Sequence, residues 1–283
     1  MAVADGGRRS AGGARGSVDG SQRSADGGQR SAPRGGPAFF RNEAPGLHRI
    51  EHAYTNLYLL EEGGRITVVD AGLPRTWLHL LRALEVLGRD VSDIDALVLT
   101  HAHFDHVGVA RRLAERGVPV LLHPADAPLA AHPYSYRRQR TPFVYPLRYP
   151  SAIPVLGAMA RAGALAVPPL TTTVALRAGE TLDVPGSPTV LATPGHTDGH
   201  VSLHVADRGA VIGGDALVTL DPYSARTGPH LVARAATADT DRSLASLDVL
   251  AATGAQTLLP GHGEPWRLGV AAAATQARRA PMA

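Results

Sequence analysis

Three histidines and an aspartate fall within six residues, directly after an apolar stretch, and this segment constrains the fold more than any other. It reads Thr100-His101-Ala102-His103-Phe104-Asp105-His106-Val107-Gly108, and the apolar residues 94–99 before it are typical of a buried strand. Neutral imidazole and carboxylate groups are ligands that zinc, iron and manganese accept. Packing alone does not require four such groups together, so we interpret the segment as part of a metal site rather than as a histidine-rich polar loop.

Three further apolar stretches each end in a glycine-flanked turn that carries a histidine or an aspartate. The turns are Pro194-Gly195-His196, Gly213-Gly214-Asp215 and Pro260-Gly261-His262. Glycine permits the tight backbone that aims a side chain inward, and ligands at the strand ends of a rigid sheet suit a preorganised site. The sequence therefore predicts that His196, Asp215 and His262 join the first segment in one metal centre.

Composition limits the partners of the chain. Its 283 residues contain no cysteine, which excludes disulfides, iron–sulfur clusters, a cysteine nucleophile and cysteine-bound zinc. The net charge of +3 is carried by residues 1–40, which hold six arginines and three aspartates, so the remainder sums to zero. A neutral folded part has no electrostatic footprint for nucleic acid. We expect a small-molecule substrate and no nucleic-acid partner, and the oligomeric state stays open.

The chain is expected to divide into a tail and one domain. Residues 1–38 are rich in glycine, serine and arginine, and such a segment buries too little apolar surface to offset the entropy of ordering. We predict a disordered tail over 1–38 and a folded domain over 39–283. No apolar segment is typical of a signal peptide or a membrane span, so we expect a cytoplasmic protein without membrane contact.

The hydrophobic pattern predicts strands and then a helix in each half of the domain. Helices are expected over 75–87, up to about 116, and over 241–252, with an alanine-rich helix at the end. The expected strands are 47–52, 55–60, 65–69, 94–99, 118–122, 172–176, 181–184, 189–192, 200–205, 210–212 and 256–259. Two sheets packed face to face with helices outside would satisfy both halves, which is an α/β fold.

Residues 124–170 interrupt this pattern. They are rich in proline, contain four of the seven tyrosines, and carry the basic residues Arg137, Arg138 and Arg140. Residues 152–167 are expected to form one helix or two short ones. An insertion of this length is often a lid or a substrate wall. A surface excursion without a role is an equal alternative.

Taken in order, the four motifs resemble the metallo-β-lactamase superfamily in its glyoxalase II-like metallohydrolase branch, over about residues 47–267. The resemblance implies a four-layer αββα sandwich with two divalent metal ions, for which we favour Zn²⁺ over Fe or Mn. It implies one ion on His101, His103 and His196. It implies a second ion on Asp105, His106 and His262, with Asp215 bridging the two.

The resemblance also implies a reaction. A hydroxide shared by the two metals would attack a small ester, thioester or lactone-like substrate, and Asp105 would be catalytic by holding that hydroxide and passing on its proton. The alternatives are an iron-dependent oxidoreductase similar to persulfide dioxygenases, a lactonase of the same fold, and a binding protein without activity. The lack of cysteine together with Asp215 disfavours a true β-lactamase.

Several other residues have both a functional and a structural interpretation. Asp70 would either support the histidine segment or serve as a turn carboxylate, and His200 would either support a ligand or be structural. Asn56 and Tyr58 are expected in the core or on the floor of the site. Five tyrosines either line a substrate pocket with the three arginines of the insertion or lie exposed in loops: Tyr134, Tyr136, Tyr145, Tyr149 and Tyr223.

Overall fold

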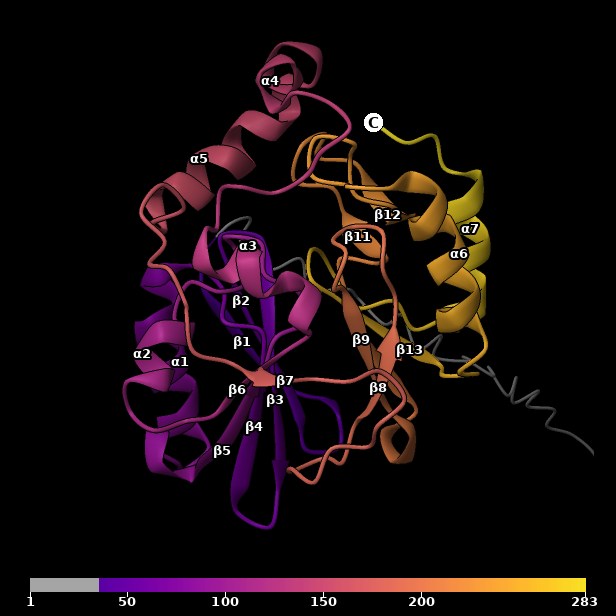
Figure 1. The fold of residues 1–283 in the computed structure, drawn as a ribbon. Helices are drawn as coiled ribbons and strands as arrows, with labels where there is room; N and C mark the ends of the chain where they lie inside the picture. The colour runs from indigo at the N-terminus through magenta and orange to yellow at the C-terminus, as the bar shows by residue number, and fades with distance from the viewer. Residues whose placement is uncertain (1–35) are drawn as a thin grey trace, which may run out of the picture. The chain divides into compact units, whose positions relative to one another are not determined.

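In the computed structural model, residues 36–283 are described, and they contain two principal β-sheets between two layers of helices (Figure 1). The predicted tail, residues 1–38, lies outside the described residues except for its last three. Together the sheets and helices form the four-layer αββα sandwich that the sequence predicts. No helix among residues 36–283 has the length and apolar content needed to cross a bilayer.

The first sheet has seven strands in chain order, β1 to β7. Strands β1 to β4 are antiparallel neighbours, whereas β4 to β7 are parallel. Their bounds are β1 Ala38–Ala44, β2 Leu47–His52, β3 Thr55–Glu62, β4 Arg65–Val69, β5 Ile94–Val98, β6 Val120–Leu122 and β7 Val174–Ala175.

The second sheet has four strands in the order β13-β10-β9-β8, and two short strands, β11 and β12, pair separately. Strands β8, β9 and β10 are antiparallel neighbours, and β13 runs parallel to β10. Their bounds are β8 Thr189–Ala192, β9 Val201–Val205, β10 Ala210–Gly214, β11 Val218–Leu220, β12 Thr227–His230 and β13 Thr257–Pro260.

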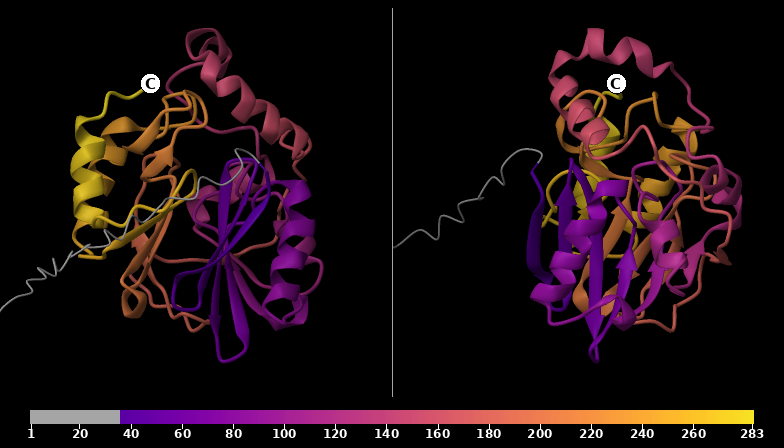
Figure 2. Two further views of the ribbon diagram at one scale, coloured as in Figure 1. Left: turned by 180° about the vertical axis from the view of Figure 1, so that it is seen from behind. Right: turned by 90° about the vertical axis from the view of Figure 1, so that its left-hand side faces the viewer.

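The helices cover the outer faces of the two sheets, as both views in Figure 2 show. Helices α1 (Trp77–Val86) and α2 (Ala110–Ala114) pack on the first sheet, and α6 (Thr240–Ala251) and α7 (Val270–Arg279) pack on the second. The remaining helices, α3 (Ala127–Ala131), α4 (Tyr145–Arg148) and α5 (Ile153–Arg161), belong to the insertion at 124–170.

Alternating side chains of β3 explain how the layers hold together. Leu57 and Leu59 point toward the α1 and α2 side, while Tyr58 and Leu60 belong to the core between the two sheets. Successive strand residues point to opposite faces, so a strand buried on both sides is apolar throughout. Full burial of each leucine contributes roughly 1.5–3 kcal/mol to folding.

Strand direction places the predicted ligands at one edge of the sandwich. Strands β4 and β5 are parallel, so Asp70 and the segment 100–108 follow strand ends on the same edge. In the second sheet β8, β10 and β13 run in one direction, so the turns at His196, Asp215 and His262 also share an edge. The insertion crosses above these loops, with α4 and α5 at the top of Figure 1.

Several local predictions differ from the structure. The strand predicted at 181–184 is wrong, because there only Thr181 bridges to Thr189, and Pro185 and Pro188 just after it have no N–H to donate. The strand predicted at 172–176 is reduced to β7 at the sheet edge. Strand β1 precedes the first predicted strand, and β11 and β12 lie in a segment in which no strand is predicted.

Candidate metal centre

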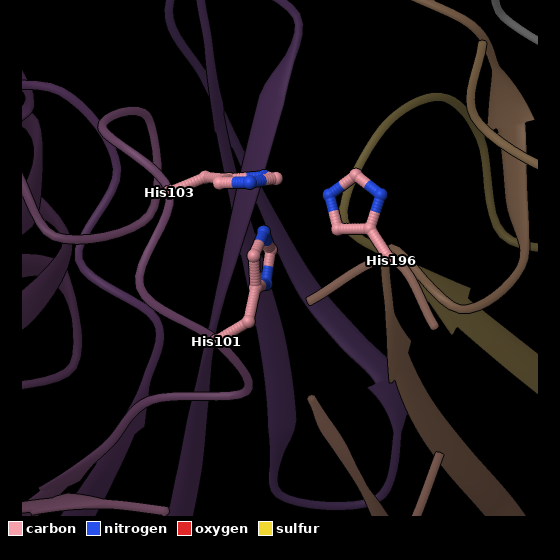
Figure 3. A group of neighbouring side chains, drawn as sticks. All are labelled: His101, His103 and His196. Carbon is pink, nitrogen blue, oxygen red and sulfur yellow. The ribbon is translucent and has the colours of Figure 1, made fainter. Parts of the chain in front are cut away.

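All seven predicted ligand side chains lie together at the shared edge, and each is between 0% and 6% exposed. We call this set the metal centre. Four of them stand on the loop after β5, and the other three follow β8, β10 and β13. Figure 3 shows the imidazole rings of His101, His103 and His196 converging from the two halves of the domain. The sequence-predicted set is thus brought together in three dimensions.

The ligand atoms fall into three overlapping groups, and within each group they lie within 4.8 Å of one another. One group is His101, His103 and His196, and another is Asp105, His106 and His262. The third group is His101, His106 and Asp215, which connects the other two. The first two groups have the composition that the resemblance implies for two separate ions.

The Asp215 carboxylate lies between the two groups. Its Oδ2 atom is 3.4 Å from Nε2 of His196 and 3.2 Å from Nε2 of His262. Its Oδ1 atom is 3.6 Å from Nε2 of His106. One carboxylate therefore faces imidazoles of both groups, which is the position that a bridging ligand requires.

The donor atoms themselves indicate that the centre fits metal ions. The Nε2 atoms of His101, His103, His106 and His196 are buried and, within the described part of the chain, have no hydrogen-bond partner. The same holds for Oδ1 of Asp215. Leaving a buried polar atom without a partner costs roughly 1–3 kcal/mol. Several such atoms converging on one spot are explained by coordination to divalent cations, for which imidazole and carboxylate are suitable ligands.

For His101, His106 and His262 the protein holds the opposite ring nitrogen, whereas Nδ1 of His196 is also buried without a partner among the described residues. Nδ1 of His106 donates to Asp70 Oδ2 over 3.0 Å, and Nδ1 of His262 donates to the Tyr54 carbonyl over 2.7 Å. Nδ1 of His101 shares a hydrogen bond of 3.0 Å with Thr100 Oγ1. Fixing Nδ1 orients each ring so that Nε2 points into the centre, as in many metal-binding histidines.

Asp70 supports two parts of the histidine segment. Besides His106, it accepts a hydrogen bond of 2.8 Å from the Thr100 backbone N–H, and its oxygens lie 2.9 and 3.0 Å from Thr100 Oγ1. Its backbone has a φ of 62°, a left-handed conformation that aspartate tolerates better than most residues. Of the two interpretations of Asp70, the supporting role agrees with these contacts.

His200 and a glycine position Asp215. The Asp215 backbone N–H donates to Nε2 of His200 over 3.0 Å, and Nδ1 of His200 lies 2.9 Å from Thr193 Oγ1. A Cβ on Gly261 would lie 2.1 Å from Oδ1 of Asp215, so only glycine fits at that position. His200 therefore fixes the backbone of Asp215, which agrees with a supporting role.

The loop of His262 rests on β3. The Asn56 side-chain amide donates to the carbonyls of Pro260 and Gly263 over 2.9 and 2.7 Å. The Tyr58 hydroxyl also donates to the Pro260 carbonyl, over 2.6 Å. Both residues are fully buried, and they support the loop of His262 from the core.

Asp126 is a supporting residue that the sequence analysis does not single out. It accepts hydrogen bonds from Ala102 N (3.1 Å), Thr197 Oγ1 (2.7 Å) and Gly199 N (2.7 Å). It therefore ties the loop of His101 and His103 to the loop of His196. Asp126 lies in a Pro-Ala-Asp segment without a ligand motif, and only its burial in the structure reveals its role.

The two groups differ in their electrostatics. Burial lowers the pKa of His103 to about 4, and it lowers the pKa values of His101 and His196 well below their usual range with the help of neighbouring histidines. Burial also opposes protonation of His106, but Asp215, Asp70 and Asp105 outweigh it and raise its pKa to about 9. The first group is thus a neutral histidine set, and carboxylates dominate the second.

A small cavity lies over the metal centre. Besides the ligands His103, Asp105, His196, Asp215 and His262, it is lined by eight residues without charge: Phe104, Tyr136, Leu156, Met159, Pro222, Tyr223, Val232 and Ala236. We call it the metal cavity. Its volume is about 20 Å³, room for about one or two water molecules. Two of the ligands, His103 and His196, also line a larger groove beside it, so the metal centre is reached from there as well.

Only some of the predicted pocket residues reach this region. Tyr136 and Tyr223 line the metal cavity with their hydroxyl oxygens 3.4 Å apart. Arg137 lines a neighbouring groove of about 250 Å³, where it pairs with Asp198 at 2.9 Å. Tyr134 instead donates to the Ala164 carbonyl, and Tyr145 packs beside Ala233 and Ala235. The insertion thus forms part of the wall of the metal cavity through Tyr136, Leu156 and Met159.

Known proteins share both the sequence pattern and the fold. A family model described as the metallo-beta-lactamase superfamily matches residues 52–262. The probable metallo-hydrolase YflN of Bacillus subtilis is 28% identical over 248 residues, which span 82% of this chain and 88% of YflN. The probable metallo-hydrolase YqjP of the same organism is 28% identical over 221 residues, 73% of this chain and 66% of YqjP.

Two solved structures are similar as well. The metallo-beta-lactamase family protein TTHA1429 from Thermus thermophilus is 29% identical with a TM-score of 0.59, over 82% of this chain and 78% of that one. The protein TTHA1623, solved in a di-iron-bound form, is 30% identical with a TM-score of 0.54, over 77% of this chain and 92% of that one.

Proposed function

The chain belongs to the metallo-β-lactamase superfamily, and from this we propose that it is a hydrolase of small ester, thioester or lactone substrates that works with two divalent ions. The observation that carries the proposal is the position of Asp215 between two groups of buried imidazoles, four of which have an Nε2 atom without a hydrogen-bond partner among the described residues. Two adjacent cation sites joined by one carboxylate suit hydrolysis by an activated water.

The proposed chemistry divides between the ions and the protein. Two divalent ions held by these residues would lower the pKa of a bound water and polarise the substrate carbonyl. The carboxylate of Asp105 lines the metal cavity, and its Oδ2 atom is 3.3 Å from Nε2 of His262. Burial opposes the charge of Asp105, but His106 and His262 outweigh burial and lower its pKa, so the carboxylate is ionised at neutral pH. It can therefore accept a proton from the attacking water and pass it to the leaving group.

The lining of the metal cavity supports a substrate with an uncharged reacting end. Apart from the predicted ligands, no acidic or basic side chain lines it in the described part of the chain. Aromatic and aliphatic side chains favour an apolar acyl group, while the Tyr136 and Tyr223 hydroxyls offer hydrogen bonds to a substrate oxygen. We therefore favour acyl esters, acyl thioesters and lactones as substrates.

Metal analysis of the purified protein combined with a substrate panel tests the proposal. We expect two ions per chain, with Zn²⁺ favoured, and turnover of at least one aryl ester, acyl thioester or lactone. The di-iron form of TTHA1623 makes iron the first alternative metal. One iron per chain with oxygen consumption would instead identify an oxidoreductase. Full metal loading without turnover of any class would identify a binding protein.

A further inference from the structure

A second and larger cavity lies beside α1 and α5, away from the metal centre. Its volume is about 600 Å³, within the range of small-molecule sites. We call it the basic cavity. Six of the side chains that line it carry the argument: His52, Arg75, Trp77, His79, Arg112 and Arg161.

The basic cavity has an unbalanced positive charge. Arg75, Arg112 and Arg161 line it together with no acidic residue, and among the described residues none of these three arginines forms an ion pair with a carboxylate. By contrast, neighbouring Arg111 pairs with Glu115 at 2.9 Å. Like charges gathered in one concavity focus a field that attracts anions.

The walls of the basic cavity are well fixed. Trp77 is only 8% exposed, and the guanidinium carbons of Arg112 and Arg116 lie 5.9 and 4.7 Å from its ring centroid. The Arg75 backbone N–H donates to the Ala162 carbonyl over 3.0 Å, which joins the start of α1 to the end of α5. The three arginines thus come from three separate segments held in one place.

We propose that the basic cavity binds a small dianion of the phosphate type. A guanidinium group presents paired N–H donors that match phosphate oxygens, and three of them without carboxylate partners leave room for such a ligand. The His52 and His79 rings add hydrogen-bonding groups at the same wall. A concave site of this size suits a small anion rather than an extended polyanion such as nucleic acid.

Helix α5 joins the basic cavity to the metal cavity. Leu156 and Met159 on one face of α5 line the metal cavity, while Ala158, Arg161 and Ala162 line the basic cavity. An anion held by Arg161 would restrain the helix that forms a wall over the metal centre. Phosphate is therefore expected to slow amide hydrogen exchange in residues 153–162.

The test is titration of the metal-loaded, full-length protein with inorganic phosphate, followed by calorimetry and by hydrogen exchange. The double variant Arg112→Gln/Arg161→Gln should raise the dissociation constant for phosphate about tenfold or more, because hydrogen bonds between the guanidinium groups and the anion are lost. It should also abolish the protection of 153–162. Both side chains are exposed, and a melting curve without phosphate verifies that the variant is folded.

Arg111→Gln is the matched control, because Arg111 lies on the same helix as Arg112 but is paired with Glu115. It should leave phosphate affinity within about twofold of wild type, as expected for an exposed ion pair. Equal affinity in the double variant, or an equal loss in Arg111→Gln, would overturn the proposal. Protection confined to the loop 100–108 would place phosphate at the metal centre and overturn it as well.

Discussion

Helix α5 lies between the metal cavity and the basic cavity, but the metal centre and the basic cavity are built in different ways. Every side chain of the metal centre is buried, and most of its imidazoles are oriented by a hydrogen bond on the far ring nitrogen. The basic cavity has exposed arginines from three segments, which line an open space of about 600 Å³. One region is a preorganised ligand set, and the other is a concentration of charge.

This difference determines how each region should respond to mutation. In the metal centre, the loss of one group removes a coordination bond or the contact that aims it, so effects should be large and local. In the basic cavity, several arginines contribute to anion binding and solvent screens their charges, so each substitution should have a smaller, graded effect on affinity.

Replacement of the bridging carboxylate should have the largest effect. Asp215→Ala removes the group between the two imidazole sets, so metal content should fall toward one ion per chain. Turnover should drop by more than about a hundredfold, beyond the 10- to 100-fold that loss of an outer contact typically costs. Metal content by mass spectrometry and kcat on the best substrate of the panel measure both effects.

The exposed carboxylate Asp207 provides the control, and Asp207→Ala should retain two ions and wild-type turnover. Two ions in Asp215→Ala would contradict the bridging position of Asp215. They would also remove the main contrast between the metal centre and the basic cavity.

Replacement of Asp70 should have the next largest effect. Asp70→Asn keeps an acceptor for the Thr100 N–H but loses the carboxylate that accepts the His106 Nδ1 proton. We expect about 10- to 100-fold weaker binding of the ion at Asp105, His106 and His262, with a smaller change at the three-histidine group. Stepwise competition with a chelator separates the two ions. Equal weakening of both would mean that Asp70 holds the whole loop rather than one imidazole.

The ligand set of the metal centre could be predicted because each ligand follows an apolar strand in a local motif. The β5 stretch and the segment 100–108 are contiguous, and Gly195, Gly214 and Gly261 mark the other turns. Alternation of buried residues along β3 and parallel pairing of β4 with β5 then bring these ends to one edge. The αββα fold follows from the same pattern.

The role of Asp126, the basic cavity and the bounds of strand β7 could not be predicted, because they depend on contacts between distant segments that no local pattern encodes. Asp126 joins two ligand loops although its own segment has no ligand motif. Arg75, Arg112 and Arg161 become one site only when the turn before α1 meets α2 and α5. Strand β7, with two residues at the sheet edge, depends on pairing with β6 more than on its own residues. These features therefore follow from tertiary contacts rather than from local sequence patterns.

Shortening one side chain of α5 should change the substrate selectivity of the protein rather than its metal binding. Leu156 lines the metal cavity, so Leu156→Ala enlarges it and should favour longer acyl groups by about tenfold in relative kcat/KM. Leu147→Ala is the control, because Leu147 on α4 is exposed and should leave selectivity unchanged. Rates on a series of acyl chain lengths measure the shift. An unchanged length preference with two bound ions would mean that α5 is not a substrate wall.

The smallest expected effect is a pH dependence of stability from the basic cavity. Burial and the neighbouring His79 lower the pKa of His52 to about 4, whereas an unfolded histidine titrates near 6.5. Between these values the unfolded chain binds a proton that the folded chain does not, so His52 lowers stability as the pH falls from about 6.5 toward 4. Since His52 is only partly buried, we expect it to lower the free energy of unfolding by roughly 1 kcal/mol at pH 5.

The variant His52→Gln, which can still bond Thr76 Oγ1, should lose correspondingly less stability between pH 7 and pH 5. Metal loss at low pH affects both proteins, so the difference between their urea unfolding curves isolates His52. Parallel losses in the two proteins would show that its environment does not oppose protonation, and that the basic cavity is more open to solvent than its walls indicate.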